Sequence, residues 1–170
     1  DNLFVFFATR KGIVKKTPLS EYSRPRANGI WAIDLPQDDE LVNVYLTDGK
    51  QDIMLFSSSG KCIRFAESNV RSMGRVSRGV IGLRLQEGRE VVSMLVVGQG
   101  DILTVTENGF GKRTRAEDYR RQGRGGQGLI GISTSERNGR LISAKQVTDD
   151  DDIMLISDGG TLVRTCANEI

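Results

Sequence analysis

Short apolar runs that end in turn residues recur along the whole chain. Residues 3–8, 52–56, 101–106 and 152–156 are rich in β-branched, aromatic and other apolar side chains, and a polar turn containing glycine follows each run. Runs of this length are typical of β-strands, and no segment has the 3.6-residue period of a long amphipathic helix. The pattern therefore predicts an all-β fold.

The runs belong to a repeat. The turns that follow them are anchored by Gly12, Gly60, Gly109 and Gly160, which are 48, 49 and 51 residues apart. Asn-Gly and Asp-Gly pairs among these turns supply the positive φ that tight hairpins need. Two further landmarks keep the same period, namely glycine-containing segments at 28–33, 78–83 and 127–132 and apolar pairs at 41–42, 91–92 and 141–142. A period near fifty residues with about four short strands per unit is typical of propeller-type arrays.

The repeat divides the chain into units. We expect a single array with units at about 1–50, 51–100 and 101–151 and a partial unit at 152–170. About three and a half four-stranded blades cannot close a ring, since propellers have about four to eight. We therefore expect an arc or a piece of a larger disc, whose open sheet edges can pair with another copy. Because the chain begins with Asp1 and not with Met, we also expect a piece of a longer protein.

Composition excludes several kinds of function. The 170 residues are 38% hydrophobic and 27% charged, which suits a soluble folded domain. The chain has no His, so Ser-His-Asp or Cys-His catalysis and His-ligated zinc are excluded. Cys62 and Cys166 lie far apart in apolar surroundings, and we expect both to be small core residues in a reducing compartment. No membrane span, export signal, metal site or cofactor is predicted.

The small formal charge of +2 hides a segregated pattern. Residues 10–26 contain six basic and one acidic side chain, residues 61–78 five and one, and residues 111–124 six and two. These basic segments fall in the same half of each repeat, whereas acidic runs such as 38–40 and 149–152 fall in the other half. The acidic run 149–152 lacks the ligand spacing of a calcium loop, so we interpret it as a solvated turn or a patch that repels DNA.

One position sharpens this pattern. Four residues after each anchoring glycine stands a basic residue: Lys16, Arg64, Arg113 or Arg164. In a curved array such a position would repeat once per blade along an outer rim, which suits the dense phosphate charges of duplex DNA. Contacts of this kind go mostly to phosphates and read little sequence. The alternative is that these side chains only solvate exposed strands.

A glycine-arginine loop at residues 120–128 is the most unusual segment. Gly123, Gly125 and Gly128 match the spacing of a dinucleotide-binding fingerprint, but a strand pattern and not a helix follows, so we reject that interpretation. We expect a flexible cationic loop whose backbone can approach phosphates closely. A plain glycine-rich surface loop is the alternative.

The motifs together resemble those of a known family, the C-terminal domains of DNA gyrase A, and more distantly those of topoisomerase IV. The resemblance covers the whole chain and rests on residues 12–17, 52–56, 109–114, 135–139 and 160–165. It implies a six-bladed β-pinwheel in which neighbouring blades exchange strands. It also implies that double-stranded DNA wraps around a basic perimeter and that this wrap supports negative supercoiling.

The family's signature heptapeptide, Gln-Arg-Arg-Gly-Gly-Lys-Gly, has a partial match in this chain. Gly123 and Gln127 replace two of its cations, and the loop lies in a later blade than the family's own box. The residues of this box-like loop are Gln122, Gly123, Arg124, Gly125, Gly126, Gln127 and Gly128. The resemblance and the charge pattern together predict DNA contacts from Lys15, Lys16, Arg24, Arg26, Lys61, Arg64, Arg71, Arg75, Arg78, Lys112, Arg113, Arg115, Arg120, Arg121, Arg124 and Arg164.

The resemblance places the chemistry outside this chain. It implies that the cleavage tyrosine, metal carboxylates and ATP site of a type II topoisomerase lie in the gyrase A breakage-reunion domain and in gyrase B. It further implies the bacterial cytoplasm and its nucleoid. Tyr22 and Tyr119 share a repeat position and Tyr45 lies in an apolar strand, so we expect all three to be structural. The alternatives are a topoisomerase IV-type DNA-binding domain, a propeller-like scaffold for protein interactions, and an enzyme domain that uses carboxylates alone.

Overall fold

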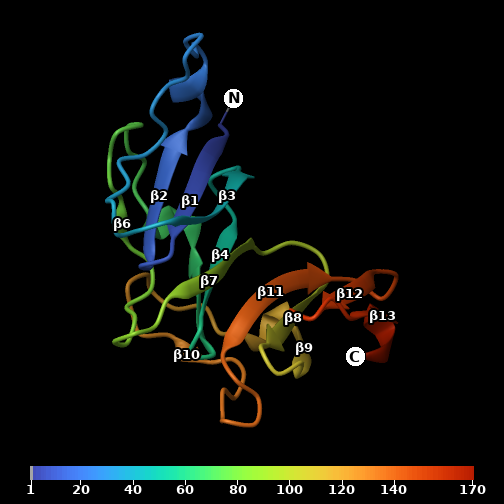
Figure 1. The fold of residues 1–170 in the computed structure, drawn as a ribbon. Coiled ribbons are helices and arrows are strands. Elements are labelled where there is room, and N and C mark those ends of the chain that lie inside the picture. The colour runs from blue at the N-terminus through green and yellow to red at the C-terminus, as the bar shows by residue number, and fades with distance from the viewer. Residues whose placement is uncertain (1) are drawn as a thin grey trace.

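The computed structural model describes residues 2–170 as a series of small antiparallel sheets (Figure 1). The strands are β1 (Phe4–Thr9), β2 (Ile13–Pro18), β3 (Leu41–Thr47), β4 (Asp52–Ser57), β5 (Lys61–Ala66), β6 (Val80–Ile81), β7 (Val91–Val96), β8 (Asp101–Thr106), β9 (Gly111–Arg115), β10 (Leu129–Ile130), β11 (Leu141–Val147), β12 (Asp152–Ile156) and β13 (Leu162–Cys166). Four 3-10 turns follow β2, β5, β9 and β13: η1 (Leu19–Tyr22), η2 (Glu67–Asn69), η3 (Ala116–Asp118) and η4 (Ala167–Glu169). Within residues 2–170, no helix has the length and apolar character to cross a bilayer. The predicted all-β fold is confirmed.

Each complete sheet contains a strand from the following unit. The first sheet has the order β3-β1-β2-β6 and the second the order β10-β5-β4-β7, so β6 and β10 each join the sheet before their own. Among the described residues the third sheet has three strands and the fourth has two. The four strands of a blade therefore come from two successive repeats, as the resemblance implies.

The anchoring glycines permit this exchange. Gly60 has a φ of 85°, and its carbonyl accepts a hydrogen bond from the Gly131 N–H at 2.8 Å. A Cβ atom at Gly60 would lie 2.2 Å from the Ile132 carbonyl oxygen. Gly12 has the same conformation (φ 87°) and receives the Gly82 N–H in the same way. The turn glycine thus serves both the hairpin, as its sequence predicts, and the close approach of the next unit.

The sheets follow one another along an arc from the N-terminal to the C-terminal end of the chain (Figure 1). Neighbouring sheets meet through β3, β7 and β11, with β7 in contact with the other two. Side chains join these strands: Asn43 Oδ1 accepts from the Met94 N–H at 3.0 Å, and Ser93 Oγ accepts from the Ala144 N–H at 3.1 Å. These strands line the inside of the arc, and β6 and β10, at the opposite sheet edges, form its outside.

Apolar side chains fill the space between successive sheets. Phe6, Ile53 and Phe65 belong to one buried cluster, and Phe56 and Cys62 to the next. The Tyr119 ring meets Phe56 edge to face, with centroids 6.3 Å apart, and the Tyr22 hydroxyl donates to a backbone carbonyl, so both tyrosines serve packing as expected.

Two apolar-run residues are more exposed than the sequence predicts. Tyr45 on β3 is exposed, and it lines a hollow on the inside of the arc. Cys166 on β13 is also exposed, so the prediction that both cysteines are core residues is wrong for Cys166. The fourth sheet has only β12 and β13 among the described residues, and little packs over its faces.

Lys15 is buried in the first sheet, contrary to the prediction that it contacts DNA. Its side chain is 0% exposed, and its ammonium donates to the carbonyl oxygens of Ala32, at 2.9 Å, and Arg75. Burial and the nearby Arg75 charge lower the pKa of Lys15 from 10.5 to about 8, and Asp34 opposes this shift. Lys15 therefore joins the extended segment around Ala32 to the second unit.

Replacing the anchoring glycines separates turn strain from the cost of blocking the exchange. Gly60→Ala and Gly109→Ala both force a left-handed conformation on alanine, which costs about 1–2 kcal/mol. Only Gly60 is approached by the next unit, since a Cβ at Gly109 has nothing within 4 Å. We expect Gly60→Ala to lower the free energy of unfolding by at least about 1 kcal/mol more, because hydrogen bonds to the exchanged segment are lost. Urea unfolding measures both variants, and equal losses would contradict the account of the exchange.

Lys15 predicts an alkaline rise in stability. Between pH 8 and 10.5 the unfolded chain holds a proton on Lys15 that the folded chain has released, so the free energy of unfolding rises with pH in this range. Lys15→Met removes this contribution, so its melting temperature should fall relative to that of the parent as pH rises through the range. Thermal unfolding of both proteins across the range measures the difference, and parallel curves would show that the Lys15 pKa is not lowered.

Candidate nucleic-acid interface

The recurring basic position reaches from one repeat to the next. Lys16 Nζ donates to the Glu67 carbonyl at 3.3 Å, Arg64 Nη1 to the Ala116 carbonyl at 2.6 Å, and Arg113 Nη1 to the Ala167 carbonyl at 2.7 Å. Each carbonyl belongs to the first residue of the next unit's 3-10 turn: η2, η3 or η4. The same basic position therefore links three successive pairs of units.

An aspartate on the neighbouring strand orients each arginine at this position. Arg64 Nε lies 2.8 Å from Asp52 Oδ2, and Arg113 Nε lies 2.9 Å from Asp101 Oδ2. Arg164 pairs with Asp152 in the same way. In the first unit Phe4 stands in the place of the aspartate, and Lys16 Nζ lies 4.9 Å from the centre of its ring. A cation–π contact thus replaces the ion pair.

These contacts overturn the prediction that the recurring position forms an exposed track. Lys16 is 6% exposed, and the side chains of Arg64 and Arg113 are 20% and 14% exposed. Only Arg164 is open, with 69% of its side chain exposed. The sequence contains a signal that was missed, because an aspartate stands twelve residues before each of the three arginines. In the hairpin Asp52 lies opposite Ala66 and Arg64 lies opposite Met54, so a spacing of twelve residues makes Asp52 and Arg64 diagonal neighbours whose side chains can meet.

The Asp52 carboxylate receives two arginines. Besides Arg64, Arg121 donates from Nη2 to Oδ1 at 2.7 Å and from Nε to Oδ2 at 3.1 Å. Burial of the Asp52 carboxyl would raise its pKa, but the hydrogen bonds from Arg64 and Arg121 outweigh burial and hold the pKa below 3.8. Asp52 is therefore ionised at neutral pH, and it holds a strand of its own sheet and a segment of the next unit together.

Five further predicted DNA contacts are tied to the protein at its surface. Arg75 Nη1 and Arg124 Nη1 each donate at 2.8 Å to a carbonyl at an equivalent place in the preceding repeat, that of Trp31 or Ile81. Arg121 binds Asp52 as described. The other two form ion pairs: Arg78 with Asp34 at 2.8 Å and Arg115 with Asp118 at 3.5 Å.

The box-like loop 122–128 is pinned to the preceding repeat, contrary to the prediction of a flexible loop. The Gln122 N–H donates to the Arg64 carbonyl at 2.7 Å, and the Gly125 N–H donates to the Gly82 carbonyl at 2.8 Å. The Gly126 carbonyl in turn accepts from the Arg84 N–H at 2.8 Å. A Cβ at Gly128 would lie 2.5 Å from the Cys62 carbonyl oxygen. The glycines therefore allow the loop to lie against the second sheet.

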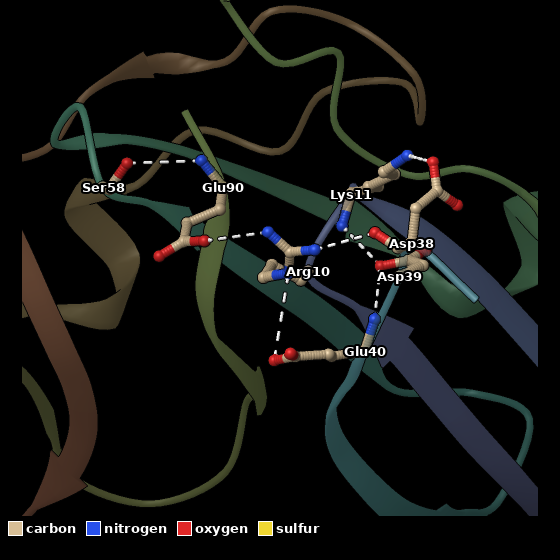
Figure 2. Close-up of polar contacts among 7 residues, drawn as sticks. All are labelled: Arg10, Lys11, Asp38, Asp39, Glu40, Ser58 and Glu90. Carbon is tan, nitrogen blue, oxygen red and sulfur yellow. Dashed lines mark hydrogen bonds and ion pairs between the residues drawn. The ribbon is translucent and has the colours of Figure 1, made fainter. Parts of the chain in front are cut away.

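The turn between β1 and β2 carries cations that are largely neutralised. Figure 2 shows Arg10 between Glu40 and Glu90, with its Nη1 3.5 Å from the Glu90 carboxylate and its Nη2 2.7 Å from the Asp38 carbonyl. Lys11 pairs with the Asp38 carboxylate. Asp39 accepts hydrogen bonds from two backbone N–H groups in the same network. This end of the first sheet therefore presents little unpaired positive charge.

Within residues 2–170, six predicted DNA contacts have charged groups that make no hydrogen bond or ion pair. They are Arg24, Arg26, Lys61, Arg71, Lys112 and Arg120, and all but the half-buried Lys61 are exposed. Arg71 and Arg120 occupy equivalent places, because each follows its 3-10 turn by the same number of residues. Their neighbours Ser72 and Arg121 form isolated β-bridges with Lys16 and Arg64 on β2 and β5, the strands that also pair with the edge strands β6 and β10. Arg71 and Arg120 therefore lie along the outer edge of the arc.

A hollow of about 490 Å³ adjoins this edge between β9 and β10. Lys112, Arg115 and Arg120 line it together with Asp118 and the apolar side chains of Leu129 and Ile130. Arg64 and Arg113 also line the hollow, but both are bound to aspartates, and Arg115 pairs with Asp118. The charges of Lys112 and Arg120 therefore give the hollow a positive character, which suits a phosphate group.

Comparison with known proteins agrees with this architecture. A model of the family described as the DNA gyrase C-terminal domain, β-propeller, matches residues 4–48, 51–98, 100–148 and 151–170. The DNA gyrase A protein of Pseudomonas aeruginosa is 55% identical over 168 residues, which are 98% of this chain and 18% of that protein. The DNA gyrase A protein of Salmonella typhimurium is 53% identical over 167 residues, which are 98% of this chain and 19% of that protein. The chain thus spans about a fifth of the length of these relatives.

Solved structures give the same result. A crystal structure of the C-terminal domain of DNA topoisomerase IV superposes with a TM-score of 0.93 at 29% identity, over 100% of this chain and 54% of that one. A structure of the DNA gyrase A C-terminal domain superposes with a TM-score of 0.87 at 26% identity, over 100% of this chain and 57% of that one. With its exchanged strands and its four matched segments, the chain belongs to the family of DNA gyrase C-terminal domains.

Proposed function

We propose that this chain binds duplex DNA along the outer edge of its arc without reading sequence. The observation that carries the proposal is the division of its cations. Of the sixteen basic residues predicted to contact DNA, ten are bound within the protein, whereas the charged groups of Arg24, Arg26, Lys61, Arg71, Lys112 and Arg120 are left without a partner among the described residues, and the equivalent Arg71 and Arg120 lie at the outer edge. Such cations suit phosphates, which fix the path of DNA but carry no base identity.

The curvature of the arc supports a bent DNA path. A duplex that touches equivalent positions on successive units must follow the direction in which those units turn. Bending a DNA site of about 20–30 base pairs by about 40–90° costs about 1–6 kcal/mol, and contacts with the protein must offset this cost. Each further unit adds cations along the same edge, so bending and finally wrapping grow with the number of units. In this proposal the units that add these cations are the sequence repeats at about 1–50, 51–100 and 101–151 and the partial repeat at 152–170.

Membership of the gyrase family supports a place for this chain in a larger enzyme. We propose that it serves a type IIA topoisomerase in negative supercoiling, with the breakage-reunion domain of gyrase A and with gyrase B as partners. Catalysis belongs to those parts, and the bacterial cytoplasm is the compartment. The close superposition on a topoisomerase IV domain favours that enzyme as the second candidate parent.

Salt dependence tests the proposal. Affinity for linear duplex should fall as salt rises, with a slope of about 0.9 log units per log unit of salt for each phosphate neutralised. Arg120→Gln should lower this slope by about one phosphate, and the double variant Arg71→Gln, Arg120→Gln should lower it by about two. Fluorescence anisotropy at several salt concentrations measures the slopes.

The matched control is Lys145→Gln, which removes one exposed charge from β11 on the inside of the arc. Its slope should equal that of the parent protein. Absence of binding at low salt, as expected of a scaffold for protein interactions, would refute the proposed function. Equal effects of Arg120→Gln and Lys145→Gln would refute the assignment of the outer edge.

A further inference from the structure

We propose that Arg64 is a positioning residue that, with Asp52 and Arg121, holds the DNA-contacting Arg120 in place and so sets the curvature of the DNA path. The inference rests on the proposed function and adds to it a role for side chains that do not themselves contact DNA. It concerns the interface between the second and third units, where Arg64 of the second unit and Arg121 of the third bind the same carboxylate, that of Asp52.

Arg64 is poorly placed to bind a phosphate itself. Its Nε donates to Asp52 at 2.8 Å and its Nη1 donates to the Ala116 carbonyl at 2.6 Å, so two edges of the guanidinium face the protein. Only a fifth of the side chain is exposed. To meet a phosphate with these donors, Arg64 would have to give up its bonds to the buried Asp52 carboxylate and to the Ala116 carbonyl, which is costly.

The groups that Arg64 and Asp52 hold lie on both sides of Arg120 in the sequence. Ala116, whose carbonyl Arg64 binds, precedes Arg120 at the start of η3. Arg121 follows Arg120 at once and binds both oxygens of Asp52. The next N–H, that of Gln122, donates to the Arg64 carbonyl at 2.7 Å. The backbone of Arg120 is therefore fixed to the second sheet from both directions, while its own charged group has no partner among the described residues.

The preceding interface has the same plan with fewer charges. Lys16 Nζ binds the Glu67 carbonyl at the start of η2, and the Met73 N–H donates to the Lys16 carbonyl at 2.8 Å, so that Arg71 is also held on both sides. Phe4 replaces the aspartate, and Ser72 replaces Arg121. The two interfaces thus place equivalent arginines, Arg71 and Arg120, but only the second uses a shared carboxylate.

The relative positions of Arg71 and Arg120 control the path of the bound DNA. DNA that touches both is bent by the angle between their units, and stiff DNA resists that bend. If the contacts around Asp52 are removed, the third unit can give way and the DNA can straighten while every exposed cation remains. Loss of Arg64 should therefore reduce the bend without reducing the number of phosphates that are neutralised.

The experiment compares bend and salt slope in the same proteins. Energy transfer between dyes at the two ends of a short duplex reports the bend at saturating protein, and anisotropy reports the salt slope. For Arg64→Gln we expect a smaller bend than with the parent and an unchanged slope. Arg64→Lys introduces the residue type that the first unit has at the equivalent position, Lys16, and it should keep most of the bend seen with the parent. Arg120→Gln should lower the slope by about one phosphate.

A second variant keeps the test valid if Arg64→Gln does not fold, as judged by circular dichroism and thermal unfolding. Arg121→Gln changes an exposed side chain and leaves the bond from Arg64 to Ala116 intact, and it should also reduce the bend with an unchanged slope. A slope lowered by about one phosphate in the Arg64 or Arg121 variant would overturn the inference, because it would mark a direct contact. A folded Arg64→Gln protein with the parental bend would overturn it too. Either result would overturn the inference about Arg64 but not the proposed function. A parent protein that does not bind DNA would refute the proposed function and the inference together.

Discussion

The open edge of each hairpin sheet is the constraint on which the structure depends. A three-stranded unit leaves a row of unpaired backbone groups along β2 or β5, and such edges invite pairing with other chains. The following unit covers this edge with β6 or β10. The approach is so close that glycine is required at Gly12 and Gly60. Because each of the first two units is completed by its successor, the array is held by contacts between neighbours and the arc has one direction along the chain.

The same dependence between neighbours divides the basic residues into two groups. Cations at the interfaces, such as Lys16, Arg64 and Arg113, bind carbonyls of the next unit and are largely removed from solvent. Cations just beyond the 3-10 turns, such as Arg71 and Arg120, are exposed, and their charged groups have no polar partner within residues 2–170. Arginines thus hold neighbouring units together at some positions and are available for the proposed DNA contacts at others, and the two groups differ in their partners and not in their charge.

The sequence predicts the fold better than the site. Period, strand content and the positive φ of the turn glycines could be predicted, because hairpins are local and the repeat displays each of them several times. The direction of the recurring basic side chain could not be inferred from its recurrence, since a structural contact between units recurs as regularly as a surface contact does. The aspartate twelve residues earlier would have pointed to the structural contact for Arg64 and Arg113. For Lys15 and the loop 122–128 the decisive contacts come from segments far away in the sequence, and no local pattern reveals them.

The exchange of strands has a consequence for the order of assembly during synthesis. The outer edge of β2 waits for its partner β6, which lies more than sixty residues further along the chain. At a translation rate of about 5–20 residues per second, the first sheet leaves the ribosome several seconds before it can be completed. While the first two units are being synthesised, the nascent chain therefore always has one sheet edge without its partner strand. This unpaired, aggregation-prone edge moves toward the C-terminus as synthesis continues.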